Sequence, residues 1–158
     1  MPANTTPLFS LTANIGAVKI GTTSAQVKSD GTSAGTGTDL MYCVLATGAN
    51  GSLVQKVRFN VVASAAGTSS VATVLRVYRS TVTTSVGSAA GATTASNTHL
   101  LAEISVPIIS ASNGTNATSY FEVPLNMFFP TGNYIMVSQH TAQTTNQNWQ
   151  AQCFASDY

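Results

Sequence analysis

Charge is the scarcest property of this chain. Asp, Glu, Lys and Arg make up 7% of its 158 residues, against about 25% in an ordinary soluble domain. Six cations and five anions give a formal net charge of +1, too little to attract nucleic-acid phosphates or anionic lipid over a broad surface. We therefore expect neither a nucleic-acid nor a membrane partner. Ser, Thr and Ala lose little entropy when immobilised, which favours a surface that lies against other protein.

Cysteines and long apolar runs are also few. Cys43 and Cys153 are the two cysteines, too few for a disulfide framework. Each lies inside a strand-like run, so buried free thiols are the favoured interpretation and a long-range bridge is the alternative. No apolar run approaches the roughly 20 residues that span a bilayer, and residues 1–6 lack the features of a secretory signal. We expect a protein made in the cytosol.

Short apolar runs that alternate with period two dominate the sequence. Apolar residues make up 44% of the chain, and the runs are rich in β-branched and aromatic residues and are separated by Gly, Asn, Ser and Pro, a pattern typical of β-strands. Residues 21–38 and 81–98 are small and polar and are expected to form long loops. The expected strands are 17–20, 40–47, 53–64, 71–80, 99–109, 119–128, 134–140 and 149–156.

The alternation within these runs predicts one buried and one solvated face. In the run 53–64, for example, Leu53, Val57, Phe59 and Val61 share one side, and polar side chains share the other. Such faces are the signature of antiparallel sheets packed as a sandwich. The predicted fold is all-β, a single antiparallel β-sandwich of about eight strands, jelly-roll-like, over residues 17–158.

Residues 1–16 are expected to form an extended N-terminal arm. The apolar side chains of Leu8, Phe9 and Leu11 would let such an arm dock on a neighbouring molecule. A frayed tail is the alternative, because chain ends without tethering contacts are commonly poorly ordered.

Two motifs in the Gly/Ser-rich loop resemble functional sites. Gly31–Gly35 matches G-x-S-x-G around Ser33, but that nucleophile elbow needs a strand before it and a helix after it. Neither is predicted here, so a hydrolase using Ser33 is the disfavoured hypothesis and no enzyme activity is expected. A calcium site on Asp30 and Asp39 is also disfavoured against a glycine-rich turn, because calcium-binding repeats of that type occur in stacked copies.

The remaining metal-ligating residue types show no ligand spacing. His99 and Glu103 lie four residues apart on one expected strand, and His140 ends another. A zinc site needs three or four ligands, and these histidines with the two cysteines do not supply the pattern. Surface histidines are the favoured interpretation, and no metal or cofactor is predicted.

Four of the six cations fall on two successive expected strands, 53–64 and 71–80. If those strands pair, they form one basic patch with tyrosines nearby, where Arg and Tyr would anchor an acidic protein surface or a glycan. An ordinary solvated strand face is the alternative. The predicted partner-binding residues of this patch are Lys56, Arg58, Arg76, Tyr78 and Arg79.

Segments from residue 48 onward resemble small head decoration (cement) proteins of tailed bacteriophages. The order of these segments carries the resemblance. They are Gly48–Ser52 leading into Val57–Phe59, then Val71–Tyr78, Leu100–Ile104, Phe121–Asn126 and Pro130–Tyr134, closing on Asp157-Tyr158.

The resemblance implies a non-enzymatic β-sandwich on the outer surface of a capsid. Such a protein would be assembled in the host cytoplasm, would form a homotrimer, and would bridge and stabilise capsomers of the major capsid protein. The N-terminal region is the capsid-contacting part in that family, and residues 1–47 match it least well.

A tail or fibre component that binds a host receptor or glycan is the alternative function. The stretch 143–152 is rich in Asn and Gln and contains Trp149, the one tryptophan of the chain. Aromatic faces stack on sugars while amides bond their hydroxyls. A last strand whose Trp149 packs in the core is the favoured interpretation of this stretch.

Overall fold

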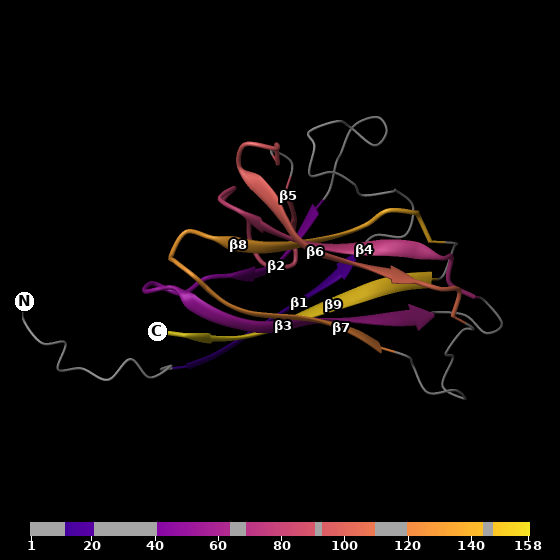
Figure 1. Cartoon of the computed structure of the whole chain (residues 1–158), viewed down its shortest axis with the longest axis horizontal. Helices are drawn as coiled ribbons and strands as arrows, with labels where there is room; N and C mark the ends of the chain where they lie inside the picture. Colours follow the sequence, from indigo (N-terminus) through magenta and orange to yellow (C-terminus); the bar gives the residue numbers. More distant parts are fainter. Residues whose placement is uncertain (1–11, 21–40, 64–68, 91–92, 110–119, 144–146) are drawn as a thin grey trace, which may run out of the picture.

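The computed structural model describes residues 12–20, 41–63, 69–90, 93–109, 120–143 and 147–158 (Figure 1). Their regular structure consists of nine β-strands, and no helix among them is long and apolar enough to cross a lipid bilayer. The strands are β1 Thr12–Ile20, β2 Met41–Ala46, β3 Ser52–Ala63, β4 Thr73–Ser80, β5 Ala89–Ala90, β6 Thr98–Val106, β7 Tyr120–Phe129, β8 Tyr134–Gln139 and β9 Gln147–Asp157.

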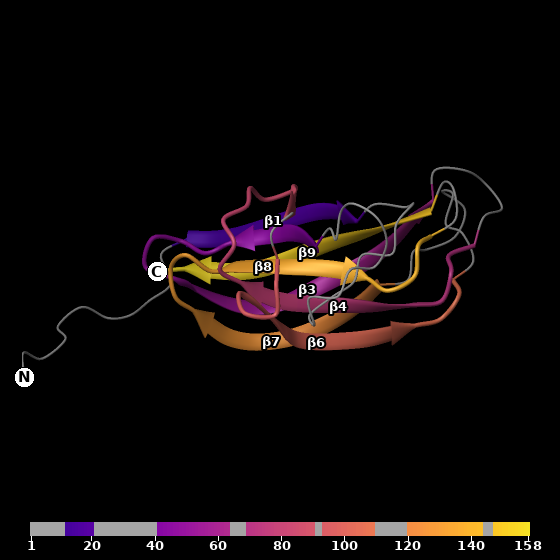
Figure 2. The ribbon, with the colours of Figure 1, turned by 90° about the horizontal axis from the view of Figure 1, so that it is seen from above.

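Two sheets pack face to face, as predicted (Figures 1 and 2). The four-stranded sheet has the order β1-β9-β3-β7, and the five-stranded sheet has the order β5-β2-β8-β4-β6. Pairing is antiparallel and nested: β1 pairs with β9, β2 with β8, β3 with β7 and β4 with β6. Each of these pairs encloses the next along the chain.

Alternation places a hydrophobic core between the two sheets. Its largest side chains include Trp149, Phe59, Ile20 and Leu75, all fully buried. A second, smaller cluster lies on the other side of the five-stranded sheet, because Tyr78 and Met136 alternate with core residues along β4 and β8. Its buried members are Met41, Cys43, Tyr78, Ala90 and Met136.

All eight expected strands are present with bounds shifted by up to three residues in most cases, and the larger differences are at β1 and β5. β1 begins at Thr12 instead of Ala17, because Thr12–Gly16 pair with the end of β9 although they lack a strong alternating pattern. Residues 12–16 therefore belong to the sheet and not to the arm, while residues 1–11 lie outside the described residues. The short β5 lies in the expected loop 81–98; backbone pairing with β2 forms it, and its two alanines give little propensity signal.

Candidate docking surface

The outer side of the four-stranded sheet forms a continuous surface that we call the four-stranded face. The strand register aligns its side chains in rows across β1, β9, β3 and β7. The first row is Ile15, Phe154, Lys56 and Pro124; the second is Ala17, Gln152, Arg58 and Glu122; the third is Lys19, Gln150, Asn60 and Tyr120. Leu53 and Phe128 extend it beyond the first row. The expectation that Leu53 shares the buried side of Val57 is wrong, because an irregularity between Val54 and Lys56 shifts the alternation.

Large apolar side chains stand exposed on this face. Ile15 is 63% exposed, Tyr120 58% and Phe128 54%. Phe128 lies edge-on against the ring of Tyr158, with centroids 5.7 Å apart. A sheet faces water more cheaply with polar residues outward, so a group of exposed rings and aliphatics indicates a surface that contacts another molecule.

A compact ionic and aromatic cluster occupies the middle of the four-stranded face. Glu122 Oε1 accepts hydrogen bonds from Lys56 Nζ at 2.8 Å and from Arg58 Nε and Nη2 at 2.8 and 2.7 Å. The Arg58 guanidinium lies 4.7 Å from the ring centre of Tyr120 and 5.5 Å from that of Phe154. Lys56 Nζ is also 5.5 Å from the Phe154 ring centre. These contacts hold the guanidinium in place.

The same contacts shift the protonation of Glu122. The hydrogen bond from Lys56, then that from Arg58, lower the pKa of Glu122 below its ordinary value of 4.5, against a smaller opposing effect of burial. Glu122 is therefore ionised at neutral pH. One carboxylate faces two cations, so the cluster keeps an excess of one positive charge.

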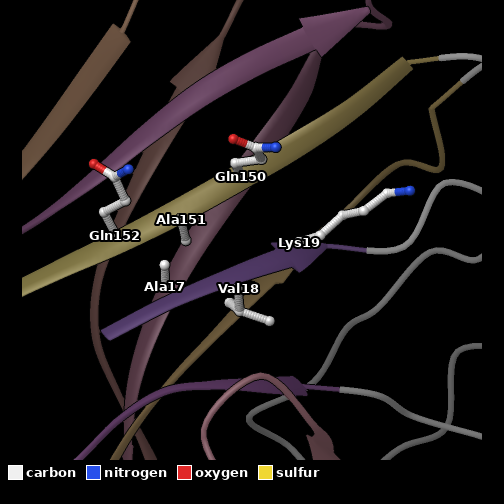
Figure 3. A pocket seen from close by; sticks show the side chains of 6 residues that line it. All are labelled: Ala17, Val18, Lys19, Gln150, Ala151 and Gln152. Atoms are coloured by element: carbon white, nitrogen blue, oxygen red, sulfur yellow. The ribbon is translucent and has the colours of Figure 1, made fainter. Parts of the chain in front are cut away.

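A hollow of about 230 Å³ lies beside this cluster, between β1 and β9 (Figure 3). Gln150 and Gln152 leave the same side of β9, Ala17 contributes only a methyl group, and Lys19 extends from the end of β1. The rim therefore carries two primary amides and one ammonium group. This arrangement offers hydrogen-bond donors, including a charged one, to a ligand.

Comparison with known proteins gives a structural similarity. No protein-family model matches the chain, and no curated protein matches it. The chain is similar to a solved structure described as "Cyanophage Pam1 capsid asymmetric unit", with a TM-score of 0.41 and 13% sequence identity over 100% of both chains. A similarity at this level does not establish a shared function.

The structure divides the predicted basic patch. β3 pairs with β7 and β9, whereas β4 pairs with β6 and β8, so the two strands lie in different sheets. Lys56 and Arg58 lie on the four-stranded face. Arg76 belongs to the other sheet, where its Nε lies 3.2 Å from Glu103 Oε2 and its Nη1 lies 3.2 Å from His140 Nδ1. The expectation of a single patch is wrong, because the alternation of a strand does not specify which strand pairs with it.

Arg79 has a local structural partner. Its Nε donates a hydrogen bond to Asn133 Oδ1, in the turn that precedes β8. Asn133 also donates its side-chain amide to the carbonyl oxygen of Pro130 at 2.8 Å. Arg79 therefore supports the turn between β7 and β8 and lies away from the cluster around Arg58.

Two predicted contact residues are fully buried. Tyr78 belongs to the second cluster, and its hydroxyl accepts a hydrogen bond from Ser138 Oγ at 3.4 Å. It lies on the predicted side of β4, but the cluster that includes Ala90 covers that side. Trp149 lies in the main core against Phe121, with ring centroids 6.0 Å apart. A partner or a sugar cannot reach either ring, so the glycan platform on Trp149 is wrong.

The two cysteines are buried free thiols, as the favoured interpretation predicted. Burial raises the pKa of Cys43 to about 11 and that of Cys153 to about 12, and a backbone hydrogen bond with Leu45 opposes the rise at Cys43 only in part. Within the described ranges, no three His, Cys, Asp or Glu side chains gather as metal ligands would. Six residues singled out in the sequence lie outside the described residues: Leu8, Phe9, Leu11, Asp30, Ser33 and Asp39.

Sequence reasoning missed the most distinctive group of the face. Lys56 and Arg58 lie on β3. The residues around them come from strands far from β3 along the chain: Tyr120 and Glu122 from β7, and Phe154 from β9. Because Tyr120 and Glu122 alternate with Val123, the sequence indicates that the side chains of Tyr120 and Glu122 point outward. It could not show that this side is shared with Arg58.

Proposed function

We propose that this chain is a non-enzymatic structural protein of a virion, a capsid decoration protein that binds the outer surface of the shell. Two observations support the proposal. The segments from Gly48 onward resemble phage head decoration proteins in their order. The described structure is a sandwich with one sheet face that exposes Ile15, Tyr120 and Phe128.

The exposed apolar group on the four-stranded face carries the proposal. Complete burial of a large apolar side chain is worth about 1.5–3 kcal/mol, so covering three of them gives a useful but modest contact. Lys56 and Arg58 on this face are already paired with Glu122, which limits the cost of covering their charges. A face of this kind suits a partner that presents the same site many times.

We further propose that the decorating unit is a homotrimer bound to the major capsid protein. Three linked copies raise the apparent affinity by about 10²–10⁴ without any new contact. This gain would convert the modest contact of each face into stable bridging between neighbouring capsomers. Assembly would take place in the host cytoplasm, without a cofactor and without nucleic-acid or membrane partners.

Binding to undecorated phage heads tests the proposal. Purified protein should bind heads saturably and stoichiometrically, and should raise the temperature at which the heads release DNA. A triple variant, Ile15→Ser, Tyr120→Ser and Phe128→Ser, should bind at least about tenfold more weakly, as expected for the loss of more than 1.4 kcal/mol. A matched variant on exposed residues elsewhere, Val86→Ser with Leu100→Ser, should bind as the native protein does.

Three outcomes would contradict parts of the proposal. Absence of head binding at any concentration would overturn the decoration role, and native affinity in the triple variant would overturn the assignment of the face. Binding to host cells but not to heads would favour the tail or fibre alternative. Sedimentation of the free and head-released protein measures its mass, and a monomer in both states would overturn the trimer.

A further inference from the structure

Positive charge is concentrated on the four-stranded face. The face carries three cations, Lys19, Lys56 and Arg58, and one anion, Glu122, an excess of two positive charges. The whole chain has a formal charge of +1, so the rest of the chain carries one net negative charge. Among the described residues outside the face, Arg76 and Arg79 balance Glu103 and Asp157, so the net positive charge of the described residues lies on this face.

We infer that the four-stranded face recognises an acidic, partly apolar protein segment, with one carboxylate of that segment seated in the hollow between Lys19, Gln150 and Gln152. This inference rests on the proposed docking role of the face and adds the chemistry of the partner.

The cations of the face keep donors for an incoming anion. Arg58 uses Nε and Nη2 on a single oxygen of Glu122, and Lys56 uses one bond to the same oxygen. Lys19 makes no ion pair with any of the described residues. Bonds from an ammonium or guanidinium group to a carboxylate are about twice as strong as neutral ones, so these donors favour an acidic ligand over a neutral one.

The hollow has the size and lining for a carboxylate. Ala17 is small, and its position across from Gln152 leaves the space that a larger side chain would fill. Both glutamine amides can donate N–H groups, and the Lys19 ammonium donates as well. Apolar Ile15 lies two positions before Ala17 on the same outer side of β1, so a segment that places an acid in the hollow meets apolar surface beside it.

Two other occupants match the face less well. A second copy docked face to face would bring two positively charged surfaces together, and like-charge juxtaposition disfavours an interface. A nucleic acid would seek cations along a groove and free aromatic faces for stacking. Here the Tyr120 and Phe154 rings already lie against Arg58, and neighbouring Ile15 and Phe128 require an apolar partner.

An NMR titration with a ten-residue poly-L-glutamate tests the ligand chemistry. At about 10 mM ionic strength, where charges act over about 30 Å, the side-chain amide signals of Gln150 and Gln152 should shift saturably. The shifts should disappear near 1 M salt, where the screening length is about 3 Å. Lys19→Gln should weaken binding by about two- to fivefold, the range expected for one exposed ion pair, while Lys19→Arg should retain it.

Arg76→Gln is the matched control, because it removes one positive charge from the opposite sheet. Its affinity for poly-L-glutamate should equal that of the native protein. Equal weakening by Arg76→Gln and Lys19→Gln would overturn the inference, since only net charge would then matter. Shifts absent from Gln150 and Gln152, or tighter binding of a ten-residue oligothymidylate at the same amides, would overturn it as well.

Head binding separates the failure of this inference from the failure of the proposed function. If heads bind the protein but Lys19→Gln and salt leave that affinity unchanged, the acidic partner is wrong and the decoration role stands. If poly-L-glutamate binds at the hollow but heads are not bound, the decoration role is wrong and the ligand chemistry stands.

Discussion

The side-chain amide of Asn14 donates hydrogen bonds to both carboxylate oxygens of Asp157, at 2.9 and 3.1 Å. This contact joins β1 to the end of β9. Buried Ser52 on β3 donates its hydroxyl to the same carboxylate, and the backbone N–H of Gly48 donates to Ser52 Oγ at 3.0 Å. Asn14 also reaches the carbonyl oxygen of Ala46 at 3.0 Å. Asp157 is therefore the centre of a network that connects three strands of one sheet to the neighbouring β2.

Asp157→Ala should destabilise the protein by about 1–3 kcal/mol, because it leaves the buried Ser52 hydroxyl without its acceptor and removes both bonds from Asn14 to the carboxylate. Urea unfolding followed by circular dichroism measures the loss. Ser156→Ala, one residue earlier on the outer side of β9, should change stability by less than about 0.5 kcal/mol. Equal stability of the two variants would show that the network contributes little.

Trp149→Ala should cost about 3–5 kcal/mol, since it removes a fully buried aromatic side chain from between the sheets. Trp149→Phe should cost less, because a ring remains against Phe121. The native protein should emit at short wavelength and shift to longer wavelength on unfolding, with all signal from this one tryptophan. Long-wavelength emission from the folded protein would contradict its burial.

Glu122 should make stability depend on acid pH. Its pKa is lower in the folded protein than its ordinary value of 4.5, so its ionised form stabilises the fold above that pH, and the stabilisation is lost as the pH falls through the folded pKa. Carboxyl-carbon NMR should show this low pKa directly. In Lys56→Gln the pKa of Glu122 should return toward 4.5, because Lys56 is its main cause.

Thermal melting between pH 7 and pH 3 provides the matching stability measurement. Glu122→Gln should lower the melting temperature at pH 7 and flatten the dependence on pH below about 4.5, since the glutamine does not titrate. An unchanged pH profile in Glu122→Gln would show that the ion pairs with Lys56 and Arg58 do not contribute to stability.

Gly16→Ala should strongly destabilise the sandwich. A Cβ atom at position 16 would overlap the carbonyl oxygen of Val44, because β1 passes close to the backbone of β2 there. Overpacking of a well-filled site costs about 1–3 kcal/mol or more, and here the obstacle is backbone. Ala17→Ser, at the next position but on the exposed side, should change stability by less than about 0.5 kcal/mol. Chemical denaturation of both variants gives the comparison.

Cys43 and Cys153 should resist a thiol reagent such as DTNB in the folded protein. Both thiols are buried, and their pKa values of about 11 and about 12 keep the reactive thiolate scarce even at pH 9. In guanidinium chloride both should react rapidly. Rapid reaction of either thiol under native conditions would contradict its burial.

The sequence alone determined the class of fold and most strand positions. Alternation in runs such as 53–64 specifies which residues of a strand point the same way, and the Asn50-Gly51 pair marks a turn, where Gly51 takes a φ of +96°. These signals are local, so they can be read from the sequence without knowing which strands pair. They failed at Thr12–Gly16 and at Ala89–Ala90, where backbone bonds to β9 and β2 form strands from residues of weak propensity.

Only the tertiary structure decided which outward residues share a surface. β3 and β4 are consecutive, yet they lie in different sheets, so Arg58 and Arg76 face opposite directions, and Glu122 joins Arg58 through β7 instead. Tyr78 points outward from β4 but is covered by the cluster that contains Ala90. The physical reason is that alternation shows which residues of one strand point the same way. Which strands become neighbours is determined by the burial of whole apolar faces and by backbone pairing between distant parts of the chain.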